Sequence, residues 1–287
     1  MKMGFIGAGK VGLCFGLYLQ QSNFTVTGYF SRSDHSARTA SMKTGTRFFE
    51  NISDLVAKSE GIFITTNDDQ IETACRQLAD SVITLKGMFV AHMSGALSSE
   101  VLESAHKKGA VTFSLHPLQA FADVDKSVTD LKNTYFGIEG QERLEILEEI
   151  LKQTGNPFLR LLPEQKTRYH IIACVVSNYL VALIDYGVEM FGSMGIDTDK
   201  GLQALMPMIK GTVENIAQLG LEEALTGPIA RGDLQTIEKQ LGIFGAEEIK
   251  QADTYRFLNK LTLDLALKNK LKDEQKIEKL KQILSTT

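Results

Sequence analysis

Cysteine is scarce in this chain of 287 residues, which contains only three. Cys14, Cys75 and Cys174 are far apart and lie in apolar or helix-like stretches. None of them falls in the short spacings that metal sites and disulfide frameworks need. We therefore expect three buried free thiols in a reducing compartment, and no metal centre.

Positive charge is not in excess either. The formal net charge is −4 and the isoelectric point is near 5.8, so nucleic acid is not an expected partner. Internal repeats and low-complexity tracts are also absent. What is present is a 43% hydrophobic composition, enough for a large core, in a chain long enough for two domains.

No long hydrophobic run is present. The longest uncharged apolar stretch, residues 171–184, is interrupted by Ser177 and Asn178 and is too short to cross a bilayer. The first residues lead directly into the apolar sequence GFIG, without the basic and small-residue regions of a signal peptide. These absences predict a soluble, cytoplasmic protein with no membrane partner.

Strands and helices alternate in the first half of the chain. Apolar runs predict strands at 3–6, 25–30, 61–65, 88–91, 111–115, 135–138 and 158–162, and helical periodicity predicts helices at 11–21, 33–42 and 69–80. Such alternation is typical of a mostly parallel sheet with helices on both faces. Farther on, strand signals vanish, and helices are expected at 164–194, 200–219, 233–241, 246–268 and 273–284. The predicted fold is an α/β, doubly wound Rossmann-type domain over 1–162, followed by an all-α domain over 163–287.

A glycine-rich turn follows the first predicted strand. It fits the pattern G-x-G-x-x-G and consists of Gly7, Ala8, Gly9, Lys10, Val11 and Gly12. Gly7 permits a tight turn, Gly9 lets a diphosphate approach the backbone, and Gly12 lets the next helix pack on the strand. Free amides at the start of that helix would bind the phosphates. The turn therefore predicts a dinucleotide site; the alternative is a glycine-rich turn without a ligand.

The end of the second predicted strand selects the cofactor. NAD sites usually have a carboxylate here, but this chain has Ser31, Arg32 and Ser33. Arg32 would attract the 2′-phosphate of NADP, and the serines would donate hydrogen bonds to it. NADP is therefore favoured, and the nearby Asp34 leaves NAD as the alternative cofactor. Arg32 could instead be an ordinary surface cation, with Ser33 only capping the next helix.

Polar residues follow three further strands. The carboxyl ends of parallel strands face the ligand crevice, so we expect Thr66, Asn67 and Asp68 beside the nicotinamide ribose. Ser94 and His116 follow two later strands and should open onto the same crevice. An imidazole is easily tuned as an acid or base near neutral pH, although a structural histidine is an equal alternative.

The long predicted helix at 164–194 carries a polar face. Its members are Lys166, His170, Cys174 and Ser177, spaced by four, four and three residues, with Asn178 beside them. The helix is otherwise apolar nearly all round, so we expect it to be buried. Its polar groups then either bond to the backbone or line the cleft and meet the substrate.

The helical half supplies two more candidates. Arg231 lies in the loop sequence TGPIARGD, where it could bind a carboxylate or phosphate, or pair with Asp233. One small helical layer would not bury all of its apolar residues, which predicts a homodimer through this domain. Examples are Met206, Met208, Ile209 and Leu219.

These motifs resemble those of Rossmann-like proteins with a C-terminal domain of unknown function (DUF2520), often described as NADP oxidoreductases of the coenzyme F420-dependent type. The matching stretches are GFIGAGKVG, FITTNDDQI, HMSGALSSEVL, SLHPLQAFAD, LTGPIARGD and the YH and SN pairs of the long helix. More distantly, the chain is similar to pyrroline-5-carboxylate reductases and β-hydroxyacid dehydrogenases, in the 6-phosphogluconate dehydrogenase superfamily. The β-hydroxyacid group uses Lys and Asn four positions apart on the long helix. Here Lys166 is followed by Tyr169 and His170, with Asn178 much later, so the catalytic lysine is not carried over.

The leading hypothesis is an NADP(H)-dependent oxidoreductase that acts on a small-molecule substrate at the cleft between the domains. The substrate would face the helix that carries His170, Ser177 and Asn178. His116 or His170 would donate the proton, Asn178 or Arg231 would hold a substrate oxygen, and the cofactor would supply the hydride chemistry. The missing lysine–asparagine pair supports an alternative, a non-catalytic NADP(H)-binding sensor. A nucleotide-independent scaffold that only dimerises is the third hypothesis.

Overall fold

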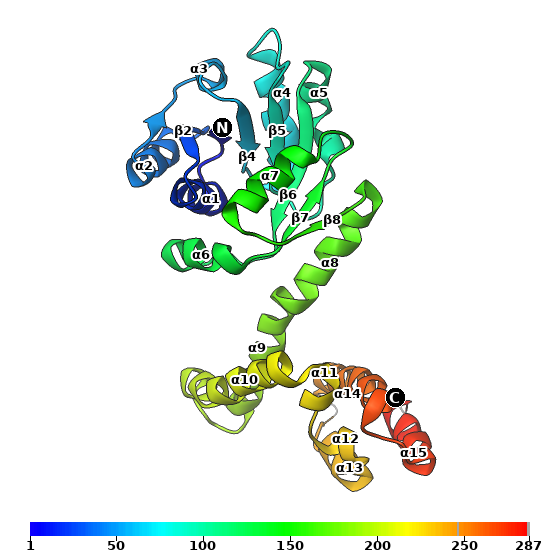
Figure 1. Cartoon of the computed structure of the whole chain (residues 1–287). Helices are drawn as coiled ribbons and strands as arrows, with labels where there is room; N and C mark the ends of the chain where they lie inside the picture. The colour runs from blue at the N-terminus through cyan, green and yellow to red at the C-terminus, as the bar shows by residue number, and fades with distance from the viewer. Residues whose placement is uncertain (246, 286–287) are drawn as a thin grey trace. The chain divides into compact units, whose positions relative to one another are not determined.

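The computed structural model describes residues 1–245 and 247–285 and divides the chain into two compact units, Met1–Leu183 and Ile184–Thr287 (Figure 1). The predicted boundary at residue 162 marks the place where the strands end. The contacts divide the chain later, because the first turns of the long helical segment pack on the sheet through Lys166 and Tyr169.

The sheet of the first unit confirms the predicted doubly wound topology. Its strands are β1 (Lys2–Ile6), β2 (Thr25–Phe30), β3 (Arg47–Phe48), β4 (Gly61–Ile64), β5 (Phe89–His92), β6 (Val111–Pro117), β7 (Phe136–Glu139) and β8 (Phe158–Arg160). Within residues 1–183 they form one sheet in the order β3-β2-β1-β4-β5-β6-β7-β8, parallel throughout except between β6 and β7. The chain runs outward from β1 in both directions. This leaves a switch point between β1 and β4, where such folds bind ligands.

Alternating side chains along the strands supply two separate cores. On β4, Phe63 packs against Phe5 and Phe15 on one face, whereas Ile62 and Ile64 belong to the core on the other face. The first face is covered by α1 (Lys10–Gln21), α2 (Asp34–Thr44), α6 (Val124–Asp130) and α7 (Glu145–Thr154). The second is covered by α3 (Ile52–Val56), α4 (Asp68–Asp80) and α5 (Glu103–Lys107). Each large apolar side chain buried in this way contributes about 1.5–3 kcal/mol, so both faces need their helices.

Several short elements are not predicted by the sequence pattern. Strand β3 pairs through two residues only, and α3 and α5 have five residues each, too few to show a period. Helices α6 and α7 are also additions to the predicted set. The first of them begins at a cap that the sequence does contain, since the Asp123 carboxylate accepts a hydrogen bond from the Lys126 amide (2.9 Å). Strand ends otherwise shift by a residue or two from the predicted ones.

The predicted helix at 164–194 is interrupted. A 3-10 turn (Pro163–Gln165) precedes α8 (Lys166–Val176), and α9 (Asn178–Ser193) follows after Ser177. The backbone of Ser177 is distorted, with φ −114° and ψ −73°, although its amide still donates to the carbonyl of Ala173 (3.1 Å). The break falls at the serine–asparagine pair that interrupts the apolar run in the sequence.

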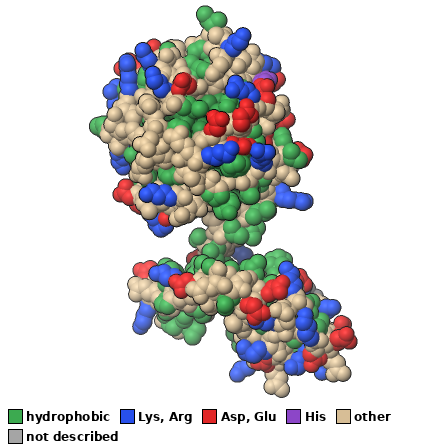
Figure 2. All heavy atoms as spheres, viewed as in Figure 1, with side chains coloured by type: hydrophobic (Ala, Val, Ile, Leu, Met, Phe, Trp, Pro, Cys, Tyr) green, Lys and Arg blue, Asp and Glu red, His purple; other side chains and the backbone are tan. Residues whose placement is uncertain are grey.

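The expectation that this segment is buried is wrong. In α8 the buried residues are Lys166 and Tyr169, whereas most of the apolar side chains between Ile171 and Leu183 are exposed. Figure 2 shows hydrophobic side chains at the surface where α8 leads into α9. Pro163–Ser193 also has the length and composition to cross a membrane. An 18-residue stretch within it has a mean hydropathy of 1.8, and 6% of that stretch is buried. This segment is longer than the uncharged run at 171–184, because only two isolated acidic residues, Asp185 and Glu189, follow that run before Ser193.

The second unit is all-α, as predicted. Its helices after α9 are α10 (Thr198–Leu219), α11 (Leu221–Ala224), α12 (Pro228–Arg231), α13 (Leu234–Leu241), α14 (Ile249–Asn269) and α15 (Glu274–Ser285). A small core joins the last four, made of Ile229, Ile237, Leu263, Ala266, Leu271, Leu280 and Leu284. Ala246, the first residue of the helix predicted at 246–268, lies outside the described residues.

Candidate functional site

Three pockets lie at the carboxyl ends of the strands in the first unit. The arginine pocket is lined by the ends of β1, β2 and β4 and by α4. The serine pocket is lined by the glycine-rich turn and by residues that follow β4 and β5. The histidine pocket is lined by the end of β6 and the residues that follow it, by α8 and by the start of α9. Because β2, β1, β4, β5 and β6 are consecutive in the sheet, the three pockets follow one another along the same edge.

The glycine-rich turn has the geometry that its sequence predicts. Gly7 has φ +104°, and a Cβ there would lie 2.8 Å from the carbonyl carbon of Thr65. A Cβ on Gly12 would lie 2.8 Å from the carbonyl oxygen of Gly7, which also accepts a hydrogen bond from the Thr65 hydroxyl (2.8 Å). Gly9 has open space in front of it, because nothing lies within 4 Å of a Cβ built on it. Gly7 therefore permits the tight turn, and Gly12 permits the close packing of α1 on it. Gly9 leaves room for a ligand.

The start of α1 is open to an anion. Gly9 is its N-cap and offers no side-chain acceptor, and Leu13 is bonded to the Gly9 carbonyl (3.0 Å). The amides of Lys10, Val11 and Gly12 come before that first bond and have no partner within the helix. The Lys10 ammonium turns aside and donates to the carbonyl of Ala122 (2.7 Å). Backbone amides, rather than this lysine, are therefore the donors for a diphosphate.

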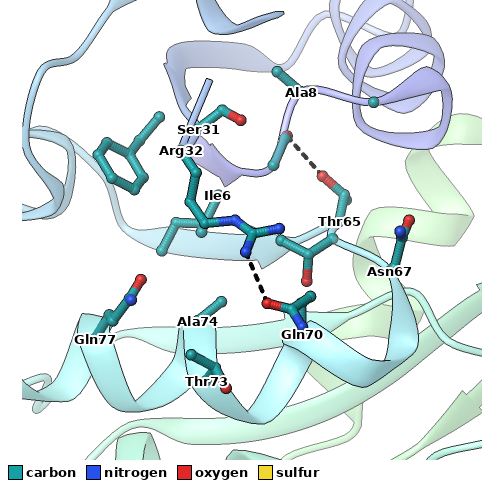
Figure 3. Close-up of a pocket in the computed structure, with 14 residues that line it drawn as sticks. Ile6, Ala8, Ser31, Arg32, Thr65, Asn67, Gln70, Thr73, Ala74 and Gln77 are labelled. Atoms are coloured by element: carbon teal, nitrogen blue, oxygen red, sulfur yellow. Dashed lines mark hydrogen bonds between the residues drawn. The ribbon is translucent and has the colours of Figure 1, made fainter. Parts of the chain in front are cut away.

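The arginine pocket encloses about 160 Å³ and contains Ala8, Ser31 and Arg32 among its lining residues. Figure 3 shows the Arg32 side chain extending across it toward α4, where Nη1 donates to Oε1 of Gln70 (2.9 Å). Arg32 is exposed and forms no salt bridge among the described residues. Its positive charge is therefore available to a phosphate group in the pocket.

Ser33 and Asp34 have a different place from Ser31 and Arg32. Ser33 is the N-cap of α2 and accepts a hydrogen bond from the Ser36 amide (3.4 Å). It is absent from the described lining of the arginine pocket, and Asp34 lies in the first turn of α2. The capping role weighed for Ser33 is thus present, while Ser31 and Arg32 are the pair that faces the pocket.

Thr66 carries a buried hydroxyl that lacks a hydrogen-bond partner among the described residues. The residue lines both the arginine pocket and the serine pocket. Leaving such a group unpaired costs about 1–3 kcal/mol, so a ligand that bonds to it recovers that loss. With the space at Gly9, the free amides of α1 and the charge of Arg32, these residues fit a dinucleotide that carries a 2′-phosphate.

The serine pocket encloses about 340 Å³ and brings predicted residues together from three strand ends. The predicted residues in its wall are Gly9, Lys10, Val11, Thr66, Asn67, Asp68 and Ser94. The Ser94 hydroxyl donates to Oδ2 of Asp68 (2.7 Å) and accepts hydrogen bonds from the amides of Ala96 (3.1 Å) and Leu97 (3.2 Å). Asp68 and Ser94 therefore fix each other across the pocket wall.

Lys166 lies behind this wall and was not foreseen there. Its side chain is 1% exposed, and Nζ donates to the carbonyl of Ser94 (3.0 Å) and to Oγ of Ser114 (2.7 Å). Burial lowers its pKa from 10.5 to about 8, although the negative charges of Glu139 and Asp68 act in the opposite direction. Lys166 is the first of the four polar residues predicted on one helix face. It points into the sheet unit, one turn before His170.

The histidine pocket encloses about 340 Å³ and unites four of the residues predicted to be catalytic, His116, His170, Ser177 and Asn178. Its wall consists of His116, Leu118, Gln119, Ala120, His170, Ala173, Cys174, Val176, Ser177 and Asn178. No Asp, Glu, Lys or Arg belongs to that lining in the described part of the chain. The pocket therefore offers neutral hydrogen-bonding groups and apolar surface to a ligand.

The two histidines of this pocket meet at Gly95. A Cβ on Gly95 would lie 2.8 Å from Nε2 of His116 and 2.8 Å from Nδ1 of His170. His116 Nδ1 is 3.1 Å from the Tyr169 hydroxyl, and His170 Nε2 is 3.5 Å from the Cys174 sulfur. Nδ1 of His170 is buried and has no partner among the described residues. Only glycine at position 95 allows both rings to approach the loop that follows β5.

His116 is held in its neutral form. Burial lowers its pKa from 6.5 to about 3, and the positive charge of Lys166 adds to this effect. At neutral pH it can therefore donate or accept a hydrogen bond, but it does not carry the extra proton of an imidazolium. The prediction that His116 is the proton donor is weakened by this environment.

Two expectations change at the level of single residues. Cys14 and Cys75 are buried free thiols, as expected, but Cys174 is only half-buried and lines the histidine pocket. Arg231, which was predicted in a loop, is exposed and lies in the short helix α12 of the second unit. Asp233 caps α13, accepting from the Thr236 amide (3.1 Å).

The residues that sequence reasoning missed are buried partners of those it found. Tyr169 and Gly95 each adjoin a predicted residue in the chain, and Lys166 was placed on the polar face with His170 but was given no role. A buried lysine gives no pattern of its own, because the sequence does not show which way the first turn of a helix points.

The comparisons agree with this architecture. Residues 1–117 match the Rossmann-like domain family, and residues 134–262 match the family described as domain of unknown function (DUF2520). This confirms the resemblance to Rossmann-like proteins with a DUF2520 domain, whereas the coenzyme F420-dependent type stays a prediction. None of the curated proteins matches the sequence.

Solved structures share the fold over nearly the whole chain. Protein TM1727 from Thermotoga maritima is 26% identical, with a TM-score of 0.74 over 94% of this chain and 100% of its own. The "putative NADP oxidoreductase BF3122" from Bacteroides fragilis is 19% identical, with a TM-score of 0.73 over 92% and 98%. Pyrroline carboxylate reductase from Plasmodium falciparum, solved with NADP bound, is 14% identical, with a TM-score of 0.58 over 99% and 100%.

Proposed function

We propose that this chain, which joins a Rossmann-like domain to a DUF2520 domain, is a soluble, cytoplasmic NADP(H)-dependent oxidoreductase. The observation that carries the proposal is the row of three pockets along the carboxyl edge of one sheet. The names of the solved relatives support the choice of cofactor, since one is an NADP oxidoreductase by name and another holds NADP.

The cofactor would occupy the first two pockets. Arg32 and Ser31 would bind the 2′-phosphate, and the amides that open α1 would bind the diphosphate. Thr66 would donate its unpaired hydroxyl to the bound nucleotide. When bound, NADPH supplies the hydride, and the protein supplies position, a proton and a dry site.

The substrate would occupy the histidine pocket. Its neutral lining fits an uncharged acceptor such as a carbonyl or imine group among apolar substituents. His116 would orient that group by a hydrogen bond, and His170, whose Nδ1 has no partner among the described residues, is the candidate for the proton donor. Ser177 and Asn178 would contact the substrate from the break between α8 and α9.

Turnover tests this proposal. Purified protein should oxidise NADPH in the presence of at least one member of a panel of ketones, aldehydes and cyclic imines, and NADH should support a lower rate. Gly95→Ala should abolish turnover and leave binding of the adenosine half of NADPH unchanged, because a methyl group there displaces both imidazoles, which are absent from the described lining of the arginine pocket. Gly211→Ala is the matched control, since a Cβ at that position meets nothing within 4 Å.

Three outcomes contradict the proposal in different ways. Absence of NADPH binding at millimolar concentration removes the cofactor assignment. Tight binding without turnover across the panel indicates the sensor instead of the enzyme. Unchanged turnover in His170→Ala removes the assignment of that residue as the proton donor.

A second copy of the chain is the partner we propose for the exposed helical segment. Ile171, Ile172 and Val175 are each at least half exposed, and leaving such a surface in water is unfavourable. The membrane is a poorer occupant, because α8 begins inside the sheet unit at the buried Lys166, and Arg168 follows one half-turn later. A homodimer would cover the apolar surface while Lys166 stays buried in the sheet unit and Arg168 stays in water.

Light scattering after size-exclusion chromatography tests the dimer. The wild-type protein should have twice the 31.7 kDa mass of one chain. The double variant Ile172→Glu/Val175→Glu should be a monomer, because a dry interface does not accept two carboxylates. Met42→Glu, at an exposed apolar residue of the sheet unit, should remain a dimer. A wild-type monomer in detergent-free buffer would contradict the proposal.

A further inference from the structure

Lys166 is buried without a carboxylate partner. It is absent from every ion pair within 4 Å among the described residues, and it is 1% exposed. Burying a charged ammonium costs several kcal/mol unless hydrogen bonds or nearby opposite charge compensate it. Here the compensation comes from two oxygen atoms, the carbonyl of Ser94 and the hydroxyl of Ser114, and from the charges of Glu139 and Asp68.

Ser94 is held from three directions. Its carbonyl accepts from Lys166, its amide donates to Nδ1 of His92 (3.1 Å), and its hydroxyl donates to Asp68 (2.7 Å). His92 is itself fully buried and bonds to the carbonyl of Ser98 (3.0 Å). The loop after β5 is thus fixed to the sheet, to α4 and to α8, and Lys166 supplies the contact with α8.

One turn of α8 joins this loop to the histidine pocket. Tyr169, which contacts His116, lies with its ring 5.6 Å from the Lys166 ammonium, and His170 follows it. Ser94 lines the serine pocket, and Gly95, the next residue, supports both imidazoles. Lys166 therefore connects the wall of the proposed cofactor pocket with the wall of the proposed substrate pocket.

We propose that Lys166 is a positioning residue, whose ammonium holds the Ser94–Gly95 loop against α8 and so sets the nicotinamide end of the cofactor site relative to the histidine pocket. The inference rests on the proposed function. Lys166 is not a catalytic residue in this scheme, because it is absent from the described lining of both pockets. It acts through Ser94 and Tyr169.

A titration that separates the two halves of the cofactor tests this role. Wild type, Lys166→Met, Ser114→Ala and Arg168→Met would each be titrated with NADPH and with 2′,5′-ADP, which carries only the adenosine half. Arg168→Met is the matched control, an exposed cation two residues along the same helix. The emission of bound NADPH reports the surroundings of the nicotinamide ring directly.

The expected results differ between the two ligands. Affinity for 2′,5′-ADP should stay within experimental error in all variants, because neither Ser94 nor Lys166 belongs to the described lining of the arginine pocket, which would hold the 2′-phosphate. Lys166→Met should bind NADPH about tenfold more weakly, the effect of losing one charge-assisted hydrogen bond, and should shift its emission. Ser114→Ala should show a smaller change in the same direction, and Arg168→Met none.

A merely structural lysine would give another pattern. If Lys166→Met lowers stability but binds NADPH with wild-type affinity and emission, the inference is wrong. If Lys166→Met fails to fold, Ser114→Ala decides, and wild-type emission in that variant overturns the inference. Failure of the wild-type protein to bind NADPH refutes the proposed function itself, and is recognised before any variant is compared.

Discussion

The hydroxyl of Tyr169 lies 3.1 Å from Nδ1 of His116 and 3.5 Å from the carbonyl oxygen of the same residue. The two side chains come from α8 and from the end of β6, and they meet beside Gly137, where a Cβ would lie 2.6 Å from the hydroxyl. This contact fixes which nitrogen of His116 remains for a ligand. The orientation of the imidazole is thus set by a residue outside the described lining of the histidine pocket.

Tyr169→Phe should lower turnover without weakening the cofactor site. The substitution leaves Nδ1 of His116 unpaired, which costs about 1–3 kcal/mol and frees the ring to turn. We expect kcat to fall about tenfold or more, with NADPH affinity unchanged. Steady-state kinetics at saturating NADPH measures the change, and Tyr179→Phe, an exposed tyrosine on α9, is the control. Equal rates in both variants would show that the hydroxyl does not position His116.

Arg32→Ala should reduce selectivity for NADP. Loss of one charge-assisted contact with the 2′-phosphate costs about 1.5–3 kcal/mol, so the Kd for NADPH should rise about tenfold to a hundredfold. The Kd for NADH should change little, because that cofactor lacks the phosphate. Calorimetric titration of both cofactors measures the ratio, with Arg76→Ala as the control on the pocket-lining helix α4. Parallel weakening for both cofactors would place the phosphate elsewhere.

Alkylation should select Cys174. Burial raises the pKa values of Cys14 and Cys75 to about 11, so their thiolates are scarce, whereas Cys174 is half-buried in the wall of the histidine pocket. Iodoacetamide at pH 8 should add one group, at Cys174, and abolish turnover. Mass spectrometry and activity measure this, and Cys174→Ala should be active and resistant. Loss of activity in the treated variant would place the sensitive group outside this pocket.

Acid should destabilise the fold partly through His92. Burial lowers its pKa from 6.5 to about 4, so below pH 6.5 the unfolded chain binds a proton that the folded chain refuses until about pH 4. Stability is therefore lost as the pH falls through this window, by up to about 3 kcal/mol from this residue. His92→Gln should be less stable than wild type at pH 7, and the difference should narrow toward pH 4. Urea unfolding at several pH values measures it; a constant difference would contradict the assignment.

The sequence predicts the sheet well because its information is local. The turn from Gly7 to Gly12 and the apolar runs before Thr66, Ser94 and His116 are visible without the structure, and the parallel topology then places those residues on one edge. The buried Lys166 is not predictable in the same way, since its direction depends on how α8 begins. The exposure of Ile171 and its neighbours could not be predicted from the sequence either. An apolar helix has the same sequence pattern whether its own chain or a partner would cover it.

The most direct test of the account is a crystal soaked with NADP. Electron density is expected for the 2′-phosphate at Arg32, for the diphosphate at the amides that open α1, and for the nicotinamide ring beside Ser94, facing His116 and His170. Density at another surface, or none at millimolar NADP in crystals that leave the edge of the sheet open to solvent, would contradict it.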